Sequence, residues 1–426
     1  MSVELTVFLI VFAVLFLMRA PIWSSLLVSS SVYLVIAGEQ LTMIARKTVA
    51  GMDSFLLLGI PMFILAAELM NSCGVTTALF NFANKLVGWI PGGLAHTNVV
   101  CSMLFAGMSG SSAADCAGLG TMEIKAMTDE GFDRSFSAAI TAASSCIGPI
   151  IPPSIPMVVY SSLAGASIGK LFMGGMVPGV LMGLMMMAVC YIISKRRGYP
   201  RAEGIRGREI CKAFIEALPG LMVPVILLGG IYGGFFTPTE AAAVAAVYSL
   251  ILGAVVYRQI NLRKLRQILS KTVANSAIIL MIMGAASLFG YVLTVEQVPA
   301  KLTGGLLSIS TNKYVMLMIF NVIFLILGCF MELNSILLIF VPIVLPVVRM
   351  LGIDMVHFGV VVVLNLMIGT ITPPFGMMMY IAAGIAREPV HKVIKELVPY
   401  YVGLILMLLL TTYVPAVVMF LPNMMK

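Results

Sequence analysis

The sequence predicts an all-α membrane protein built from inverted repeats, with two re-entrant hairpins and two broken transmembrane helices. Three observations lead to this prediction: the composition, the recurrence of apolar runs of helix length, and a proline signature that occurs twice. Of the 426 residues, 60% are hydrophobic and only 10% are charged, with a mean hydropathy of +1.07. Soluble domains have about 45–50% apolar and about 25% charged residues, so lipid must be the main solvent.

The proline signature divides the chain into two halves. IGPIIPP covers residues 147–153 and IGTITPP covers residues 368–374, so the offset from Pro152 to Pro373 is 221 residues. The same offset relates Gly107 to Gly328 and the amphipathic stretch 40–52 to 261–273. Agreement of several unlike features indicates an internal repeat. We therefore expect a first repeat over 1–210 and a second over 211–426.

Two basic clusters fix the expected orientation, because cytoplasmic loops are rich in lysine and arginine. One surrounds the loop 195–212 and the other covers 258–271. Their members are Lys195, Arg196, Arg197, Arg201, Arg206, Arg208, Lys212, Arg258, Arg263, Lys264, Arg266 and Lys271. With these loops inside, the N-terminal run is an uncleaved span that starts outside and precedes Arg19. Nucleic-acid binding is not expected, since the charges flank hydrophobic spans.

The predicted elements follow from this count. The first hairpin, about 97–127, enters from inside, and the second, about 314–350, enters from outside, so equivalent elements have opposite topology. Ordinary spans are expected at 4–18, 22–37, 54–72, 171–194, 219–234, 238–257, 274–294 and 397–421. The broken helices cover about 135–166 and 357–386. Inverted repeats with broken helices are typical of many secondary transporters.

The double prolines lie in mid-span, where proline removes a donor and ends a helix. Unwound backbone at membrane depth is tolerated only where it is buried or lines a cavity. Its carbonyls can bind cations, and the half-helix N-termini offer donors to anions. Each oxygen-rich hairpin tip, one with GSS and one with ELNS, should face one of these loops. The Gly/Ser cluster alone would also fit close helix packing.

These features predict two or more Na⁺ sites between tips and loops, and a substrate site between the tips. The expected Na⁺ ligands are Ser109, Ser111, Ser112, Gly148, Ile150, Glu332, Asn334, Ser335, Gly369, Thr370 and Thr372. The expected substrate residues are Ser111, Asp115, Pro152, Asn334 and Pro373. Because the central segments contain no Lys or Arg, bound Na⁺ should supply the counter-charge for an anionic substrate, unless Lys125 or Arg134 does so.

Other kinds of chemistry find little support in the sequence. Seven scattered cysteines with no CxxC and three separated histidines favour neither a disulfide framework nor a zinc or other metal cluster. No GxxxxGK[ST] occurs, so this chain does not hydrolyse ATP through a Walker motif. The run at 107–112 does not fit GxSxG. We therefore expect neither an enzyme nor an organic cofactor.

Several blocks resemble one known family, the large membrane (M, DctM-like) subunit of tripartite ATP-independent periplasmic (TRAP) transporters. These blocks are GIPMFI at 59–64, GMSGSSAAD at 107–115, TAASSCIGPIIPPSIPMVVY at 141–160, GGIYGGFFTPTEAAA at 229–243 and GTITPPFG at 369–376. FTPTEAAA and GPIIPPS together are quite specific, whereas TPP alone is not. The second tip departs from many relatives, with Glu332 where Asp is common.

The resemblance implies an elevator-type transporter in the bacterial inner membrane. It implies Na⁺ symport of an organic acid, either sialic acid or a C4-dicarboxylate, together with a small four-helix membrane subunit and a periplasmic substrate-binding protein. Two alternatives stay open at this point. One is a standalone divalent anion–sodium symporter or a related ion-coupled antiporter, and the other is a channel or structural subunit with no coupled site.

Overall fold

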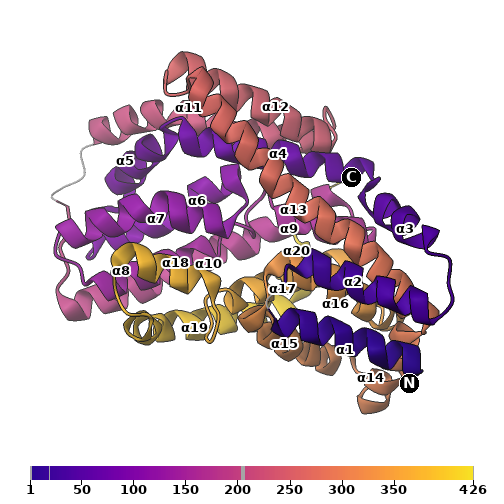
Figure 1. Cartoon of the computed structure of the whole chain (residues 1–426). Helices are drawn as coiled ribbons and strands as arrows, with labels where there is room; N and C mark the ends of the chain where they lie inside the picture. The colour runs from indigo at the N-terminus through magenta and orange to yellow at the C-terminus, as the bar shows by residue number, and fades with distance from the viewer. Residues whose placement is uncertain (1, 19, 203–206, 426) are drawn as a thin grey trace.

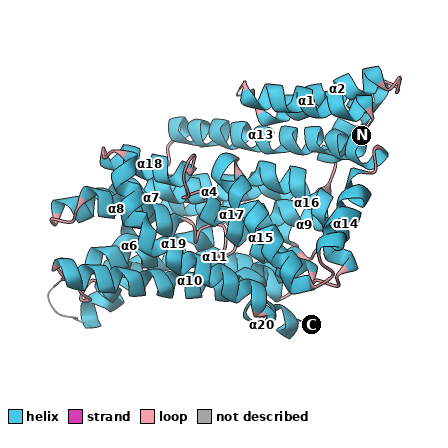
Figure 2. Cartoon of the chain, turned by 90° about the horizontal axis from the view of Figure 1, so that it is seen from below, coloured by secondary structure: helices cyan, strands magenta, loops and turns pink. Residues whose placement is uncertain are grey.

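The computed structural model describes residues 2–18, 20–202 and 207–425, and over these ranges the chain forms helices and no strands. Arg19 and Arg206, which the sequence analysis placed beside a span and in a basic loop, lie outside the described residues. The helices form two packed groups, seen from two directions in Figures 1 and 2. The predicted all-α membrane fold is confirmed.

The first group, called the wall below, consists of helices from the start of each half. In Figure 1 its longest helix, α13, crosses the molecule diagonally, and in Figure 2 α1, α2 and α13 form a layer along one side. Its members are α1 (Val3–Leu17), α2 (Ile22–Ile36), α3 (Thr42–Met52), η1 (Phe55–Leu58), α4 (Gly59–Ser72), α11 (Gly207–Tyr232), α12 (Pro238–Ile251), η2 (Leu252–Val256) and α13 (Leu262–Val295).

The second group, the central bundle, contains both hairpins and both broken helices. The hairpins are α6–α7 (Gly93–Ser109, Ser112–Asp129) and α15–α16 (Lys313–Phe330, Leu333–Met350). The broken helices are α8–α9 (Arg134–Ser145, Ile155–Ala164) and α17–α18 (Met355–Gly369, Met377–Ala386). The bundle is completed by α10 (Ile168–Arg197), α19 (Val390–Tyr413), α20 (Pro415–Met419) and η3 (Pro422–Met424).

Helix bounds recur at the offset of 221 residues. The second arm of each hairpin starts at Ser112 or Leu333 and ends at Asp129 or Met350, and the broken helices start at Arg134 or Met355. This recurrence supports the internal repeat. The opposite orientation of the halves stays a prediction. The predicted boundary at 210/211 falls within the first turns of α11.

Two helices were not predicted. α5 (Val75–Val87) and α14 (Val298–Ile309) connect the wall to the first arm of each hairpin. α4 and α5 meet at an angle of 71°. Gly74, with a φ of 84°, lies at this corner in the left-handed conformation that favours glycine. Both helices are shorter than the roughly 20 residues that a span requires.

The two amphipathic stretches, 40–52 and 261–273, differ in structure, which the repeat did not predict. In the first half the chain breaks after α3 at Asp53, and the next span begins with the 3₁₀ turn η1. In the second half, 262–273 continues directly into the span as one 34-residue helix, α13. No proline or glycine interrupts 272–276, so the intrahelical hydrogen bonds continue.

Seven helices in the described part of the chain are long and apolar enough to cross a membrane, and the bent pair α4–α5 raises this number to eight. They include α10, α11, α13, α19 and both arms of the second hairpin. The first hairpin extends over 93–129, slightly beyond the predicted 97–127, and the span predicted at 397–421 divides between α19 and α20. A multi-pass membrane protein is confirmed.

Candidate functional site

Both hairpin tips line one cavity with a volume of about 790 Å³. The first tip contributes residues 109–114 and the second contributes residues 332–335. Pro149 of the first broken loop also lines it, together with Met367 and Met377, which flank the second broken loop. This volume lies within the roughly 300–1,000 Å³ of small-molecule sites. The tips, separated by 221 residues in sequence, therefore face a common space of ligand size.

The first tip turns at Gly110, whose φ of 58° is in the left-handed region. A Cβ at this glycine would lie 2.2 Å from the carbonyl oxygen of Pro153, so the tip rests directly on the first broken loop. Ser111 then caps α7, its Oγ accepting a hydrogen bond from Ala114 N at 3.4 Å. The Ser109 Oγ accepts from Ser111 N at 3.4 Å. Hydroxyl oxygens are thus held at a helix N-terminus beside the cavity.

The second tip repeats this arrangement with a carboxylate. Glu332 is the N-cap of α16, and its Oε2 accepts hydrogen bonds from Ser335 N at 3.1 Å and Ser335 Oγ at 3.3 Å. Its Oε1 accepts from Asn334 Nδ2 at 2.8 Å. Glu332 occupies the capping position that Ser111 holds in the first half. The helix N-terminus and these donors stabilise its negative charge.

The first broken loop lies between α8 and α9 and includes a cis peptide bond between Pro152 and Pro153. Its Gly148 lies against the first tip, because a Cβ there would be 3.5 Å from Ser112 N. The Ser154 Oγ donates to Pro149 O at 2.5 Å. It also accepts a hydrogen bond from Met157 N, so Ser154 caps α9. One serine thus fixes the loop and begins the next half-helix.

The second broken loop has its own cis bond between Pro373 and Pro374. Thr370 and Thr372 lie here, and their hydroxyls donate to Met367 O at 2.6 Å and Ile368 O at 2.7 Å. Each hydroxyl oxygen keeps lone pairs for another partner.

Backbone contacts join this loop to the second hairpin. Phe375 N donates to Cys329 O at 3.2 Å. A Cβ on Gly369 would lie 2.5 Å from the Cα of Gly328, so the two chains are in direct contact at these glycines. A smaller cavity of about 520 Å³ beside this contact is lined by Glu332, Thr370 and Phe375, among others.

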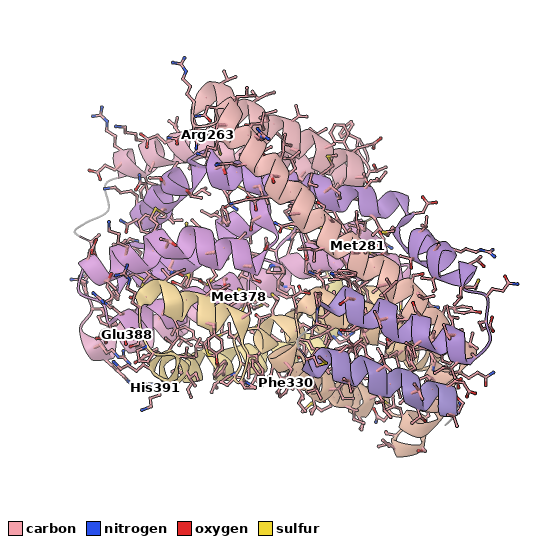
Figure 3. The ribbon with its side chains drawn as sticks, in the orientation of Figure 1. Arg263, Met281, Phe330, Met378, Glu388 and His391 are labelled. Atoms are coloured by element: carbon pink, nitrogen blue, oxygen red, sulfur yellow. The ribbon has the colours of Figure 1, made fainter. Side chains whose placement is uncertain are left out.

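The two broken helices also meet each other, at the end of α8 and in the last turn of α17. Cys146 Sγ donates to Met367 O at 3.3 Å, and these residues are 221 positions apart. The contact therefore joins equivalent positions of the two halves. In Figure 3, Phe330 marks the end of α15 at the second tip, and Met378 lies at the start of α18. The carbonyl oxygen of Met378 accepts a hydrogen bond from Cys116 Sγ at 3.6 Å.

The structure separates the predicted site residues into two sets. Those of the two tips line the large cavity: Ser109, Ser111, Ser112, Glu332, Asn334 and Ser335. Thr370 lines the smaller one. Those that line neither cavity are Asp115, Gly148, Ile150, Pro152, Gly369, Thr372 and Pro373. The loop residues lie behind the tips because the tips pack directly on the loops.

Asp115 is buried inside the first hairpin, with 1% of its surface exposed. Neither carboxylate oxygen has a hydrogen-bond partner within the described part of the chain, and Glu123, two turns further along α7, is equally buried. Asn98, Thr141 and Ser144 form a hydrogen-bonded group between the neighbouring helices α6 and α8. In the second half, Ile336 and Val344 occupy the positions equivalent to the two acids.

Sequence reasoning missed the wall side of the cavity. The lining residues of α4 are Ile64, Ala67, Glu68 and Asn71, and those of α13 are Asn275, Ile278, Ile279 and Ile282. Both sets follow the i, i+3, i+4, i+7 spacing of one helix face. Trp23 of α2 adds an aromatic side chain. A carboxylate within a predicted span, Glu68, was the signal that could have revealed this face.

No lysine, arginine or histidine within 2–18, 20–202 and 207–425 lines the large cavity. Lys125 and Arg134, the alternative counter-charges, are exposed and lie outside the lining. The ionic groups facing the cavity are the carboxylates of Glu68 and Glu332. An anion in this cavity therefore needs cations that the lining side chains do not supply.

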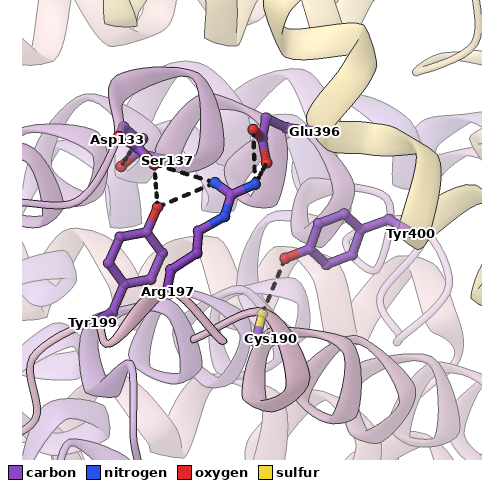
Figure 4. Close-up of polar contacts among 7 residues, drawn as sticks. All are labelled: Asp133, Ser137, Cys190, Arg197, Tyr199, Glu396 and Tyr400. Atoms are coloured by element: carbon purple, nitrogen blue, oxygen red, sulfur yellow. Dashed lines mark hydrogen bonds and ion pairs between the residues drawn. The ribbon is translucent and has the colours of Figure 1, made fainter. Parts of the chain in front are cut away.

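A polar cluster away from the cavity holds one end of the central bundle together (Figure 4). Arg197 of α10 binds both carboxylate oxygens of Glu396 on α19, at 3.0 and 2.8 Å, and Asp133 at 3.2 Å. Tyr199 OH donates to Asp133 at 2.6 Å. Partial burial and the Asp133 carboxylate raise the pKa of Tyr199 to about 12. The cluster joins α10, α19 and the start of α8.

Comparison with known sequences agrees with these features. Residues 9–417 match the family described as "Tripartite ATP-independent periplasmic transporter, DctM component". The sialic acid TRAP transporter large permease protein SiaM of Vibrio cholerae is 42% identical over 95% of both chains. The C4-dicarboxylate TRAP transporter large permease protein DctM of Pseudomonas aeruginosa is 39% identical over 92% of this chain and 91% of that protein.

Among solved structures, the YdaH transporter of Alcanivorax borkumensis has a similar fold. The TM-score is 0.65, with 15% sequence identity, over 87% of this chain and 86% of that chain. At this identity the similarity concerns the fold alone.

Proposed function

Because the chain belongs to the DctM family of TRAP transporter large permease subunits, we propose that it imports an organic acid by Na⁺ symport. The family consists of transport proteins, so the prediction that the chain is not an enzyme is confirmed. The relatives and the apolar helices establish a multi-pass protein of the bacterial inner membrane. The coupling ion, the substrate and the partners belong to the proposal.

The meeting of two oxygen-rich tips at one cavity is the observation that carries the proposal. One Na⁺ would bind between Ser109, Ser111 and Ser112 and the loop at Gly148 to Ile151, with Gly148 and Ile150 as ligands. A second would bind between Glu332, Asn334 and Ser335 and the loop at Gly369 to Thr372. Hydroxyl, carboxylate and carbonyl oxygens are ligands that suit hard cations. The contacts of Gly148 and Gly369 with the hairpins bring each loop beside its tip.

The substrate would bind between the tips, near Ser111 and Asn334. Burying an unpaired charge is costly, and the cavity lining offers no basic side chain in the described ranges. Bound Na⁺ and the N-termini of α7 and α16 would therefore provide the positive potential. Substrate and Na⁺ would strengthen each other's binding by the same factor. Asp115, Pro152 and Pro373 would act from behind the cavity.

Transport would occur by an elevator motion, in which the central bundle slides along the wall and exposes the cavity to either side. The substrate class would be that of the relatives, sialic acid or a C4-dicarboxylate. Because the family is tripartite, the chain would work with a small four-helix membrane subunit and a periplasmic substrate-binding protein. Exposed apolar side chains such as Ile10, Val14 and Val225 provide surface for lipid and for the small subunit.

Reconstitution tests this proposal. The chain, with and without the small subunit, is placed in proteoliposomes, and uptake of labelled sialic acid or succinate is measured with and without the binding protein and a Na⁺ gradient. We expect uptake only when all three proteins and inward Na⁺ are present. Full-rate transport by this chain alone would contradict the tripartite assembly, and uptake independent of Na⁺ would contradict the symport.

A further inference from the structure

The wall carries a carboxylate where an anion must pass. Glu68 lies on the face of α4 that lines the cavity, one turn from Asn71, and its side chain is half-buried. The tip residues 109–114 and 332–335 line the same cavity. Glu68 thus faces the segments that would hold the substrate, although it belongs to the other packed group of helices.

Glu68 differs from Glu332, the other carboxylate of the cavity. Glu332 accepts three hydrogen bonds as the N-cap of α16, so its charge is already stabilised. For Glu68, no hydrogen bond or ion pair is found with any residue that the structure describes. An ionisable residue at membrane depth without a structural partner is a functional candidate.

Among the described residues that line the cavity together with Glu68, none carries a positive charge. On its own helix the lining neighbours are Ile64, Ala67 and Asn71, and on α13 they are Asn275 and three isoleucines. Two unit charges about 8 Å apart interact appreciably at the effective dielectric of a protein. An anion moving past this wall is therefore repelled unless cations accompany it.

We propose that Glu68 is a charge filter: its carboxylate opposes the passage of a substrate anion that lacks its coupling cations. The inference rests on the Na⁺ symport proposed above, and it explains how the wall would prevent leakage of unaccompanied substrate. A central bundle that carries Na⁺ together with the anion presents less net negative charge to Glu68, so it can slide past this part of the wall. An anion without Na⁺ meets an uncompensated carboxylate.

The same filter sets a preference between substrate classes. With equal numbers of bound Na⁺, a dicarboxylate presents one more negative charge to Glu68 than a monocarboxylate sugar acid does. The repulsion scales with this charge. The three amides that line the cavity, Asn71, Asn275 and Asn334, can donate to and accept from hydroxyl groups. The cavity therefore favours a singly charged, hydroxyl-rich acid over a dicarboxylate.

The test compares Na⁺-dependent with Na⁺-independent uptake in proteoliposomes that contain the complete complex and its binding protein. The variant Glu68→Gln removes the charge with little change of shape, and Glu68→Asp retains the charge. Glu216→Gln is the matched control, because Glu216 lies exposed on α11 of the wall and outside the cavity lining. Thermal unfolding of each purified variant shows that it is folded.

In Glu68→Gln we expect the ratio of uptake with Na⁺ to uptake without Na⁺ to fall roughly tenfold, as removal of a nearby unit charge predicts. We expect Glu68→Asp and Glu216→Gln to keep the wild-type ratio. A wild-type ratio in folded Glu68→Gln, or an equal fall in Glu216→Gln, would overturn the charge filter and leave the symport intact. Equal uptake with and without Na⁺ in the wild-type complex would instead overturn the symport, and the filter with it.

The preference between substrate classes has its own measurement. Equilibrium binding of sialic acid and of succinate is compared at saturating Na⁺ on the purified membrane complex without the binding protein, which could otherwise select the substrate first. We expect succinate to bind at least about tenfold more weakly than sialic acid, with a smaller difference in Glu68→Gln. Tighter binding of succinate, or an unchanged difference in Glu68→Gln, would contradict the preference.

Discussion

Replacing Gly369 by alanine probes the contact between the second broken loop and the second hairpin. A Cβ at this position would lie 2.5 Å from Gly328 Cα and 2.7 Å from Gly328 C. Carbon atoms in favourable contact are about 3.5–4.0 Å apart, so the two backbones would have to separate by about 1 Å. Both neighbours are main-chain atoms, and no side chain can rotate away to make room.

The expected cost follows from a comparison with Gly384. Alanine is favoured over glycine in a helix by up to about 1 kcal/mol, and a Cβ at Gly384, within α18, would meet no atom within 4 Å. Gly384→Ala should therefore be neutral or stabilising. Overpacking of a close contact costs about 1–3 kcal/mol. We expect Gly369→Ala to be less stable than Gly384→Ala by about that amount.

Thermal unfolding of the two purified variants measures the difference, and it should appear as a lower midpoint for Gly369→Ala. Because the change separates the second tip from its loop, Gly369→Ala should also require more Na⁺ for half-maximal uptake. If Gly369→Ala unfolded at the same temperature as Gly384→Ala, the close backbone contact would not exist in the protein. A Na⁺ site between the second tip and its loop would then have no geometric support.

Two further predictions concern the cation sites and the orientation. Ser111→Ala and Thr372→Val should each raise the Na⁺ concentration for half-maximal uptake by removing one oxygen ligand, and an unchanged Na⁺ dependence in both would refute the assignment. A cysteine at position 201 should react with an impermeant thiol reagent only from the cytoplasmic side. Of the native cysteines only Cys211 is exposed, so it is replaced by serine for this test. Labelling of position 201 from the periplasm would reverse the predicted orientation.

The tips were predictable from sequence because their signals are local. Gly110 and Ser111 provide a turn followed by a helix cap, and Glu332 is the N-cap of α16. The double prolines identified both broken helices, since proline interrupts a helix wherever it falls in mid-span. The repeat offset then predicted that the two tips belong together.

The wall residues could not be found in the same way. Helices α4 and α13 are apolar around most of their surface, and only tertiary packing decides that Glu68 and Asn275 face the cavity. The sequence also did not reveal that the first tip would lie against Gly148 or that Gly369 would touch Gly328, because that depends on how closely the glycines allow two backbones to approach. α5 and α14 escaped prediction because they are too short to resemble spans.

The hydrogen bond from Cys146 to Met367 joins positions that are related by the offset of 221 residues between the two halves. Cys146 caps the end of α8 and Met367 lies in the last turn of α17, so a shift of one of these helix ends against the other would have to break this contact. The two broken loops are in this sense one mechanical element, which each half holds from its own side. A substitution at Cys146 would therefore disturb both halves at once, and we expect a shift of one broken helix to be passed to the other at this contact.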